Sequence, residues 1–240
     1  MPPLNRHRRR LIYLLVATLV TGGGFWLWSR YPSKKVTDET ITVGEEVRRY
    51  RLVAPARAAS APALLVVALH GIGDTPEAMA DYSGLDRLAA TGQAYVVYPE
   101  TRLGMWNTID VLAESRANNR DLPFVQRLVD RLKSQLKVER VCLVGMSNGA
   151  TFALLACEAC EDIDGVVAHS GASPAGLKLT ARAPILMIVG DADSAADAVR
   201  VDVAELKSAG HQVEFVLESG LGHQWSTRQN GKLDHFLLAP

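Results

Sequence analysis

A serine lies between two glycines in the stretch Gly145-Met146-Ser147-Asn148-Gly149, which has the spacing Gly-x-Ser-x-Gly. The apolar run 138–144 before it predicts a buried strand, and the apolar pattern that begins at Ala150 predicts a helix. A sharp turn between strand and helix exposes the serine hydroxyl and places the N–H groups of the helix N terminus beside it. The sequence therefore predicts that Ser147 is a nucleophile. The alternative is a tight strand–helix turn whose serine has no catalytic role.

A nucleophilic serine needs a base, and the best candidate lies near the end of the chain. A serine hydroxyl becomes reactive when a histidine accepts its proton and a carboxylate fixes the tautomer of that histidine. Folds with this serine turn place first the acid and then the histidine on loops after later strands. His223 follows the apolar run 213–217, and we expect this histidine, among six in the chain, to be the base.

The carboxylate has two candidates on the loop after the apolar run 185–189. Asp193 is the predicted acid because it lies three residues beyond Gly190, the glycine at the strand end. Asp191 is the alternative acid, and it would otherwise cap the turn. Asp197 is the least favoured because it falls on the helix that follows.

A second glycine-rich segment, His70-Gly71-Ile72-Gly73, follows the apolar run 64–69. In serine hydrolases with a strand–turn–helix nucleophile, the loop after an early strand lends a backbone N–H to the oxyanion hole. We therefore expect the N–H groups of Ile72 and Asn148 to stabilise a negative oxygen. The alternative is a glycine-rich loop of the kind that any parallel sheet contains.

Buried strands alternate with amphipathic helices through most of the chain, which predicts an α/β fold with a mostly parallel, doubly wound sheet. The segments 41–43 and 47–53 are expected to form antiparallel strands at the edge of this sheet. About fifteen residues separate the predicted strands at 163–168 and 185–189, which is too few for a helical lid. We therefore predict an open cleft, with Trp106 and Trp225 as substrate-binding walls.

Composition excludes several classes of protein. The chain has 240 residues, with 26 basic and 26 acidic side chains, so it lacks the positive charge typical of nucleic-acid binding. Three cysteines are too few for a disulfide framework. Cys157 and Cys160 are expected to be buried thiols, with a local disulfide as the alternative in an oxidising compartment. No spacing of ligands predicts a metal site, and we expect no cofactor.

The N-terminal part of the chain differs from the rest in the distribution of its charges. Residues 1–10 include an arginine cluster and 11–28 carry no charge, which predicts a basic cytoplasmic segment and a transmembrane anchor. A cleaved signal peptide is the alternative. Residues 29–40 are expected to be a linker and 41–240 a catalytic domain. Because the positive cluster stays cytoplasmic, this domain is expected in the periplasm or outside the cell. It would be anchored to the membrane or, if a signal peptide is cleaved, secreted.

Several blocks of the chain together resemble one enzyme group over roughly residues 45–225. The chain is similar to α/β-hydrolases and, more narrowly, to polyhydroxybutyrate depolymerases and feruloyl esterases. The blocks are Arg49-Tyr50-Arg51-Leu52-Val53, His70-Gly71-Ile72-Gly73, Val97-Tyr98-Pro99-Glu100, Trp106-Asn107, Phe124-Val125 with Leu128-Val129-Asp130, the glycine-bounded serine stretch, and His169-Ser170-Gly171.

The resemblance implies hydrolysis of carboxylic esters, with short acyl, aromatic or hydroxyalkanoate groups, and usually in a secreted enzyme. The chain departs from the group at Met105, where cysteine is common, and at Asn148, where alanine is commoner. It also departs at 194–196, which replaces a Val-Pro pair. Cleavage of peptides or of another acyl compound is the nearest alternative chemistry. A binding module that kept the fold without catalysis is the alternative of a different class.

Overall fold

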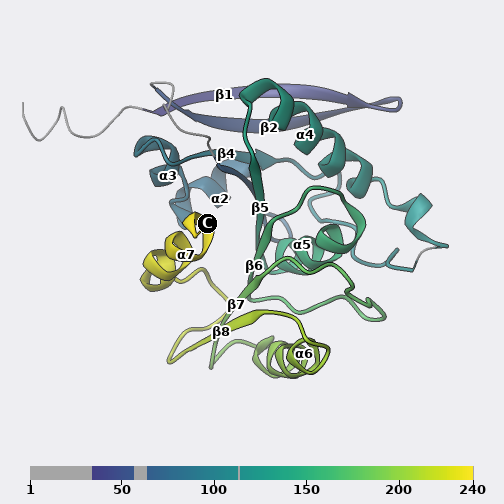
Figure 1. Ribbon diagram of the computed structural model, residues 1–240, viewed down its shortest axis with the longest axis vertical. Coiled ribbons are helices and arrows are strands. Elements are labelled where there is room, and N and C mark those ends of the chain that lie inside the picture. The colour runs from purple at the N-terminus through teal and green to yellow at the C-terminus, as the bar shows by residue number, and fades with distance from the viewer. Residues whose placement is uncertain (1–33, 57–63, 113, 240) are drawn as a thin grey trace, which may run out of the picture.

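The computed structural model describes residues 34–56, 64–112 and 114–239. In these ranges eight strands form one sheet, in the spatial order β1-β2-β4-β3-β5-β6-β7-β8 (Figure 1). β1 pairs antiparallel with β2, β2 pairs antiparallel with β4, and the other neighbours are parallel. The strands are β1 Lys34–Val43, β2 Glu46–Pro55, β3 Leu64–Leu69, β4 Ala94–Pro99, β5 Arg140–Met146, β6 Gly165–His169, β7 Ile185–Gly190 and β8 Val213–Glu218.

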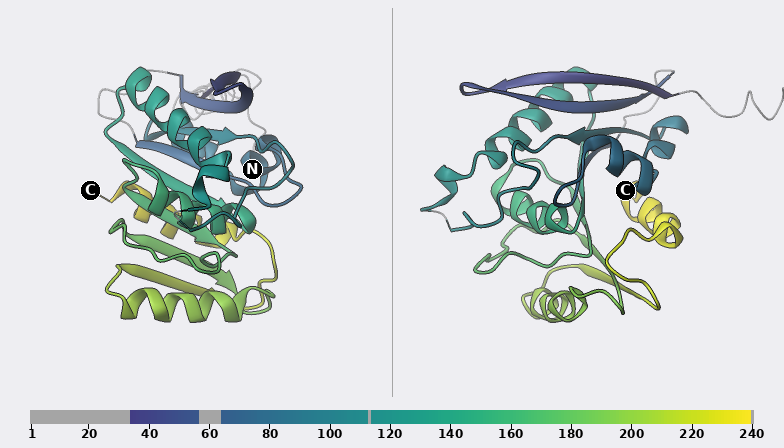
Figure 2. Two further views of the ribbon diagram at one scale, coloured as in Figure 1. Left: turned by 90° about the vertical axis from the view of Figure 1, so that its right-hand side faces the viewer. Right: turned by 180° about the vertical axis from the view of Figure 1, so that it is seen from behind.

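Helices cover both faces of the sheet (Figures 1 and 2). One face carries α4 (Asp121–Leu136), α5 (Asn148–Ala159) and α6 (Ala196–Ser208). The other face carries α2 (Pro76–Ser83), α3 (Asp86–Ala90) and α7 (Asn230–Leu238). Two short 3-10 turns, η1 Arg116–Asn118 and η2 Thr227–Gln229, complete the described helices.

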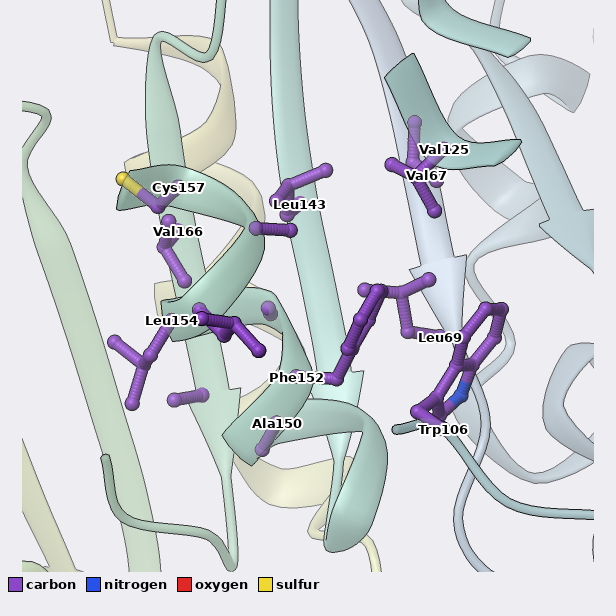
Figure 3. Packing of buried hydrophobic residues seen from close by; sticks show 14 of the residues in the cluster. Val67, Leu69, Trp106, Val125, Leu143, Ala150, Phe152, Leu154, Cys157 and Val166 are labelled. Atoms are coloured by element: carbon purple, nitrogen blue, oxygen red, sulfur yellow. The ribbon is translucent and has the colours of Figure 1, made fainter. Parts of the chain in front are cut away.

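The two layers of helices explain why the central strands are apolar without alternation. In β3, Leu65, Val67 and Leu69 point to the layer of α4, α5 and α6, whereas Leu64, Val66 and Ala68 point to the opposite layer. A strand buried on both faces needs an apolar residue at every position. Figure 3 shows the first of these cores, where Phe152 of α5 lies close to Leu69 and Trp106.

The predicted fold class is confirmed, including the antiparallel strands at the N-terminal edge. Residues 170–184, between β6 and β7, form no helix, so this segment carries no lid.

The predicted linker 29–40 is wrong in its second half, because β1 begins at Lys34. β1 pairs with β2 over its whole length, and Asp38 forms an ion pair with Arg51 across the two strands at 3.0 Å. Seven of the ten side chains of β1 are polar and only Ile41 is buried, so the strand lacks the apolar alternation that would have predicted it.

The anchor predicted at 11–28 lies outside the described residues. Within the described ranges, no helix has both the length and the apolar character needed to cross a bilayer.

A buried ion pair joins the edge of the sheet to the start of α4. Arg48 of β2 donates to Asp121 Oδ1 at 2.9 Å and to the carbonyl of Glu100 at 3.1 Å. The guanidinium also lies over the ring of Phe124, 4.1 Å from its centroid. The second oxygen of Asp121 accepts from the backbone N–H of Asn107 at 2.9 Å. One carboxylate therefore connects β2, α4 and the loop after β4.

Removing this carboxylate should destabilise the fold strongly, because it leaves the charge of Arg48 buried without a partner. We expect Asp121→Ala to lower the free energy of unfolding by about 3–5 kcal/mol. Urea unfolding of the variant measures the loss. Asp197→Ala is the matched control, since it removes an exposed pair with Arg200 and should cost less than about 1 kcal/mol. An equal effect of the two substitutions would contradict the interpretation.

Candidate active site

Ser147 lies at the turn between β5 and α5, with a positive φ of 57° and ψ of −120°. The glycines on both sides are required by contacts. A Cβ at Gly149 would lie 2.0 Å from the carbonyl oxygen of Leu69, and a Cβ at Gly145 would lie 2.2 Å from that of Gly149. The backbone N–H of Ser147 donates to the carbonyl of His169 in β6 at 2.8 Å. The turn therefore contacts both strands that neighbour β5, namely β3 and β6.

Three side chains predicted from separate loops come together at this turn. His223 Nε2 lies 2.8 Å from Ser147 Oγ, and His223 Nδ1 lies 2.9 Å from Asp193 Oδ1. They meet because β5, β7 and β8 are parallel and end at the same edge of the sheet. An ionised carboxylate only accepts, so Nδ1 carries the proton and Nε2 accepts from the serine hydroxyl. This is the tautomer that general-base catalysis by His223 requires.

Asp193 is buried behind His223. Burial opposes its ionisation, but the N–H of Ala195, which donates at 2.8 Å, and the side chains of Ser170 and His223 lower the pKa of Asp193 below its usual value. Asp193 is therefore ionised at neutral pH. Asp191, the alternative acid, instead accepts from the N–H of Gly220 at 2.7 Å, and so it caps the loop that leads to the histidine.

The loop 70–73 lies against the serine turn. A Cβ at Gly71 would lie 3.6 Å from the Cβ of Ser147, and the N–H of Gly73 donates to the carbonyl of Gly104 at 2.7 Å. Among the described residues, neither the N–H of Ile72 nor that of Asn148 donates a backbone hydrogen bond. Both donors lie on segments adjacent to Ser147, and Asn148 is the first residue of α5.

The family to which the chain belongs follows from a comparison with known sequences. The model of the phospholipase/carboxylesterase family matches residues 51–239, a range that contains Ser147, Asp193 and His223. The chain belongs to this family. The α/β-hydrolase fold implied by the sequence resemblance is thereby confirmed.

Relatives of this phospholipase/carboxylesterase family member carry the names of ester hydrolases. The NocK protein of Nocardia uniformis subsp. tsuyamanensis, named as an esterase, is 33% identical over 177 residues. The match covers 67% of this chain and 51% of NocK, so the chain spans about half the length of this curated relative.

Solved structures share the fold at low sequence identity. An S-formylglutathione hydrolase from Agrobacterium tumefaciens has a TM-score of 0.67 at 17% identity, covering 87% of this chain and 95% of that chain. A ferulic acid esterase has a TM-score of 0.62 at 17% identity, covering 86% and 97%. An esterase from Pyrobaculum calidifontis has a TM-score of 0.64 at 19% identity, covering 92% and 90%.

The two tryptophans predicted as substrate-binding walls are both buried in this family member, although Trp106 also lines a cavity beside the loop after β4. Trp106 is only 1% exposed: it stacks on Phe152 at 5.0 Å between ring centroids and donates from Nε1 to the carbonyl of His70 at 3.0 Å. Trp225 is 9% exposed and stacks on His169 at 4.8 Å. Both indoles fill the cores beneath the site because burying their large apolar surface stabilises the fold.

The side chain of Asn148 has a role that the sequence did not indicate. Its Oδ1 accepts from the N–H of Trp106 at 2.7 Å, and its Nδ2 donates to the carbonyl of Trp106 at 3.2 Å. The side-chain amide of Asn148, the residue after Ser147, thus holds the loop after β4 in place. The one available signal was that this family member has asparagine where the group it resembles commonly has alanine.

The tautomer of His169, at the end of β6, is fixed by two hydrogen bonds. Its Nε2 accepts from the backbone N–H of Ser226 at 3.0 Å, so its Nδ1 carries the proton and donates to Ser170 Oγ at 3.0 Å. Burial lowers the pKa of His169 to about 4, although Asp193 and Glu218 nearby favour protonation. His169 is therefore neutral at neutral pH.

This buried histidine should make stability depend on pH. Between pH about 6.5 and 4 the unfolded chain binds a proton at His169 that the folded chain does not, so stability falls as the pH is lowered through this window. The loss attributable to His169 should reach about 3 kcal/mol near pH 4 and vanish above pH about 7. Urea unfolding of wild type and His169→Gln at several pH values measures it. An unchanged pH slope in the variant would contradict the assignment.

Proposed function

We propose that the chain is a serine hydrolase that cleaves carboxylic esters through an acyl-enzyme formed on Ser147. The observation that carries the proposal is the continuous series of contacts from Ser147 Oγ through His223 to the buried Asp193 carboxylate. Membership of the phospholipase/carboxylesterase family and the esterase names of its relatives support the same chemistry.

The proposed reaction has two halves with the same proton carrier. In the first half, Ser147 Oγ attacks the ester carbonyl carbon while His223 Nε2 takes the hydroxyl proton. The N–H groups of Ile72 and Asn148 stabilise the oxyanion of the tetrahedral intermediate. Collapse of the intermediate breaks the bond to the alcohol, which leaves with the proton from His223. In the second half, water attacks the acyl-enzyme with His223 again as base, and the acid is released.

The proposed substrates are esters of short acyl, aromatic or hydroxyalkanoate groups. The segment 170–184 provides no helical cover, so a long acyl chain has little apolar surface in which to be enclosed. Each enclosed methylene group would contribute about 0.8 kcal/mol. One protein of the same fold is named as a ferulic acid esterase, and this name supports an aromatic acyl group among the proposed substrates.

Substitutions in the proposed triad should abolish turnover without unfolding the chain. We expect Ser147→Ala and His223→Ala each to lower kcat by about 10⁴-fold, because the members act as a unit. Asp193→Asn should cost far more than Asp191→Asn, since only Asp193 contacts the imidazole. Hydrolysis of p-nitrophenyl acetate and labelling by a fluorophosphonate probe provide the measurements. Folded wild type that neither turns over nor labels would favour the binding-module alternative.

We also propose that residues 11–28 anchor the enzyme in the cytoplasmic membrane, with the catalytic domain outside the cytoplasm. The uncharged run and the arginine cluster before it support this location. The domain then begins at Lys34, the first residue of β1, rather than at residue 41.

Cell fractionation tests the anchor. The full chain should fractionate with membranes, and protease added outside the cytoplasmic membrane should digest the domain. A chain lacking residues 1–33 keeps β1 whole and should retain esterase activity without fractionating with membranes. A product in the soluble fraction that begins near residue 25 would instead establish cleavage of a signal peptide.

A further inference from the structure

The loop after β4 exposes an unusual amount of apolar surface. Leu103 is 82% exposed and Ile109 is 85% exposed, and Met105 and Leu112 are also exposed. These residues are four of the nine large apolar side chains that are exposed in the described ranges, and they lie within ten residues of one another. Clustered exposed apolar surface marks a site that a ligand or partner covers.

This loop forms one wall of a cavity of about 440 Å³. The lining includes the apolar side chains of Leu103, Met105 and Ile109 and also the buried ion pair of Arg48 and Asp121. The volume lies within the range of about 300–1,000 Å³ that is typical of pockets for small molecules. The cavity is therefore large enough for one ring or a short aliphatic chain.

The charges around the cavity balance. Arg102 and Arg120 both bind Glu46 Oε1, at 2.6 and 2.8 Å, and Arg48 binds Asp121. The lining contains three arginines and three acidic residues, which leaves no net charge. An uncharged apolar group therefore fits this cavity better than an anionic or cationic one.

Two contacts hold the loop after β4 against the two segments that carry the proposed oxyanion donors. The N–H of Gly73, next to the proposed donor Ile72, binds the carbonyl of Gly104 at 2.7 Å. On the other side of Met105, the backbone of Trp106 is clamped by the side chain of Asn148, the residue after the nucleophile. Met105 thus lies between the two segments that carry the proposed oxyanion donors.

The strand order decides which half of an ester faces the cavity. His223 follows β8, on the side of β5 where β6 and β7 lie (Figure 1). The residues that line the cavity come from β2, from the loop after β4 and from the segment 118–121, and β2 and β4 lie on the other side of β5, beyond β3. The alcohol oxygen must lie near His223 Nε2, from which it takes its proton when it leaves. The acyl group then extends away from His223, toward β4.

We propose that the cavity beside Met105 and Ile109 is the acyl-binding subsite, and that it takes an uncharged aromatic or short aliphatic acyl group. This inference rests on the ester hydrolysis proposed above, and it assigns the acyl half of the substrate to this cavity. Acyl selectivity is then set by the loop after β4, whereas the alcohol half faces the loop that carries His223 and remains largely in solvent.

Two ester series separate the acyl half from the alcohol half. The first varies the acyl group (acetyl, butyryl, hexanoyl, benzoyl) with p-nitrophenol as the constant alcohol. The second keeps the acetyl group and varies the alcohol. In the full-length chain, Ile109→Ser and Met105→Ala should lower kcat/KM for hexanoyl and benzoyl esters at least fivefold relative to kcat/KM for acetyl esters of any alcohol.

Val201→Ser is the matched control, because Val201 is an exposed apolar residue on α6, away from the cavity. It should leave both series unchanged. Equal losses for acetyl and benzoyl esters in the loop variants would overturn the acyl assignment, and so would a change confined to the alcohol series.

A binding measurement distinguishes failure of this inference from failure of the proposed function. In full-length Ser147→Ala, methyl benzoate, an uncharged ester that this variant should not hydrolyse, should shift the methyl resonance of Met105 in NMR spectra, and Ile109→Ser should weaken this binding at least threefold. If wild type hydrolysed no ester while methyl benzoate still shifted Met105, the proposed function would fail and the binding of an uncharged aromatic group in the cavity would stand. Methyl benzoate that left Met105 unperturbed would overturn the subsite.

Discussion

The start of α5 packs so closely against the end of β3 that no side chain fits between them. A Cβ on Gly149 would lie 2.0 Å from the carbonyl oxygen of Leu69. This approach brings the loop 70–73 to the nucleophile turn, and it places the first N–H groups of α5 where an oxyanion would form. A second contact of the same kind occurs at Gly190, whose Cβ would lie 1.9 Å from the carbonyl oxygen of Leu221. It holds the end of β7, and with it Asp193, against the loop that carries His223.

The sharp turns at the ends of β5 and β6 place two serines in a strained backbone conformation, which the neighbouring strands stabilise. Ser147 and Ser170 both have φ of 57°, in a region that costs a residue with a side chain about 1–3 kcal/mol. Both are fixed by hydrogen bonds to neighbouring strands: Ser147 N–H to the carbonyl of His169, and Ser170 N–H to that of Ile188, each at 2.8 Å. Because these two strained residues lie at adjacent strand ends, the site is preorganised by the parallel sheet rather than by mobile loops.

The sequence predicted the features that depend on local pattern, and it failed where contacts are distant in the chain. The sheet and the positions of Ser147, Asp193 and His223 follow from apolar runs that end in glycine, because parallel strands bring their carboxyl ends to one edge. The burial of Trp106 and Trp225 was not predictable, since an indole suits a core as well as a cleft. The clamp from Asn148 joins residues 42 positions apart, and no periodicity reports such a contact.

The polar side chains that made β1 hard to predict from the sequence also protect the sheet against aggregation. β1 is the outermost strand on its side, and its side chains include Lys34, Lys35, Asp38 and Glu39. An exposed edge strand offers unpaired backbone groups to any other extended chain, and charges on that edge oppose such pairing. The charged β1 therefore disfavours strand-to-strand aggregation between neighbouring copies.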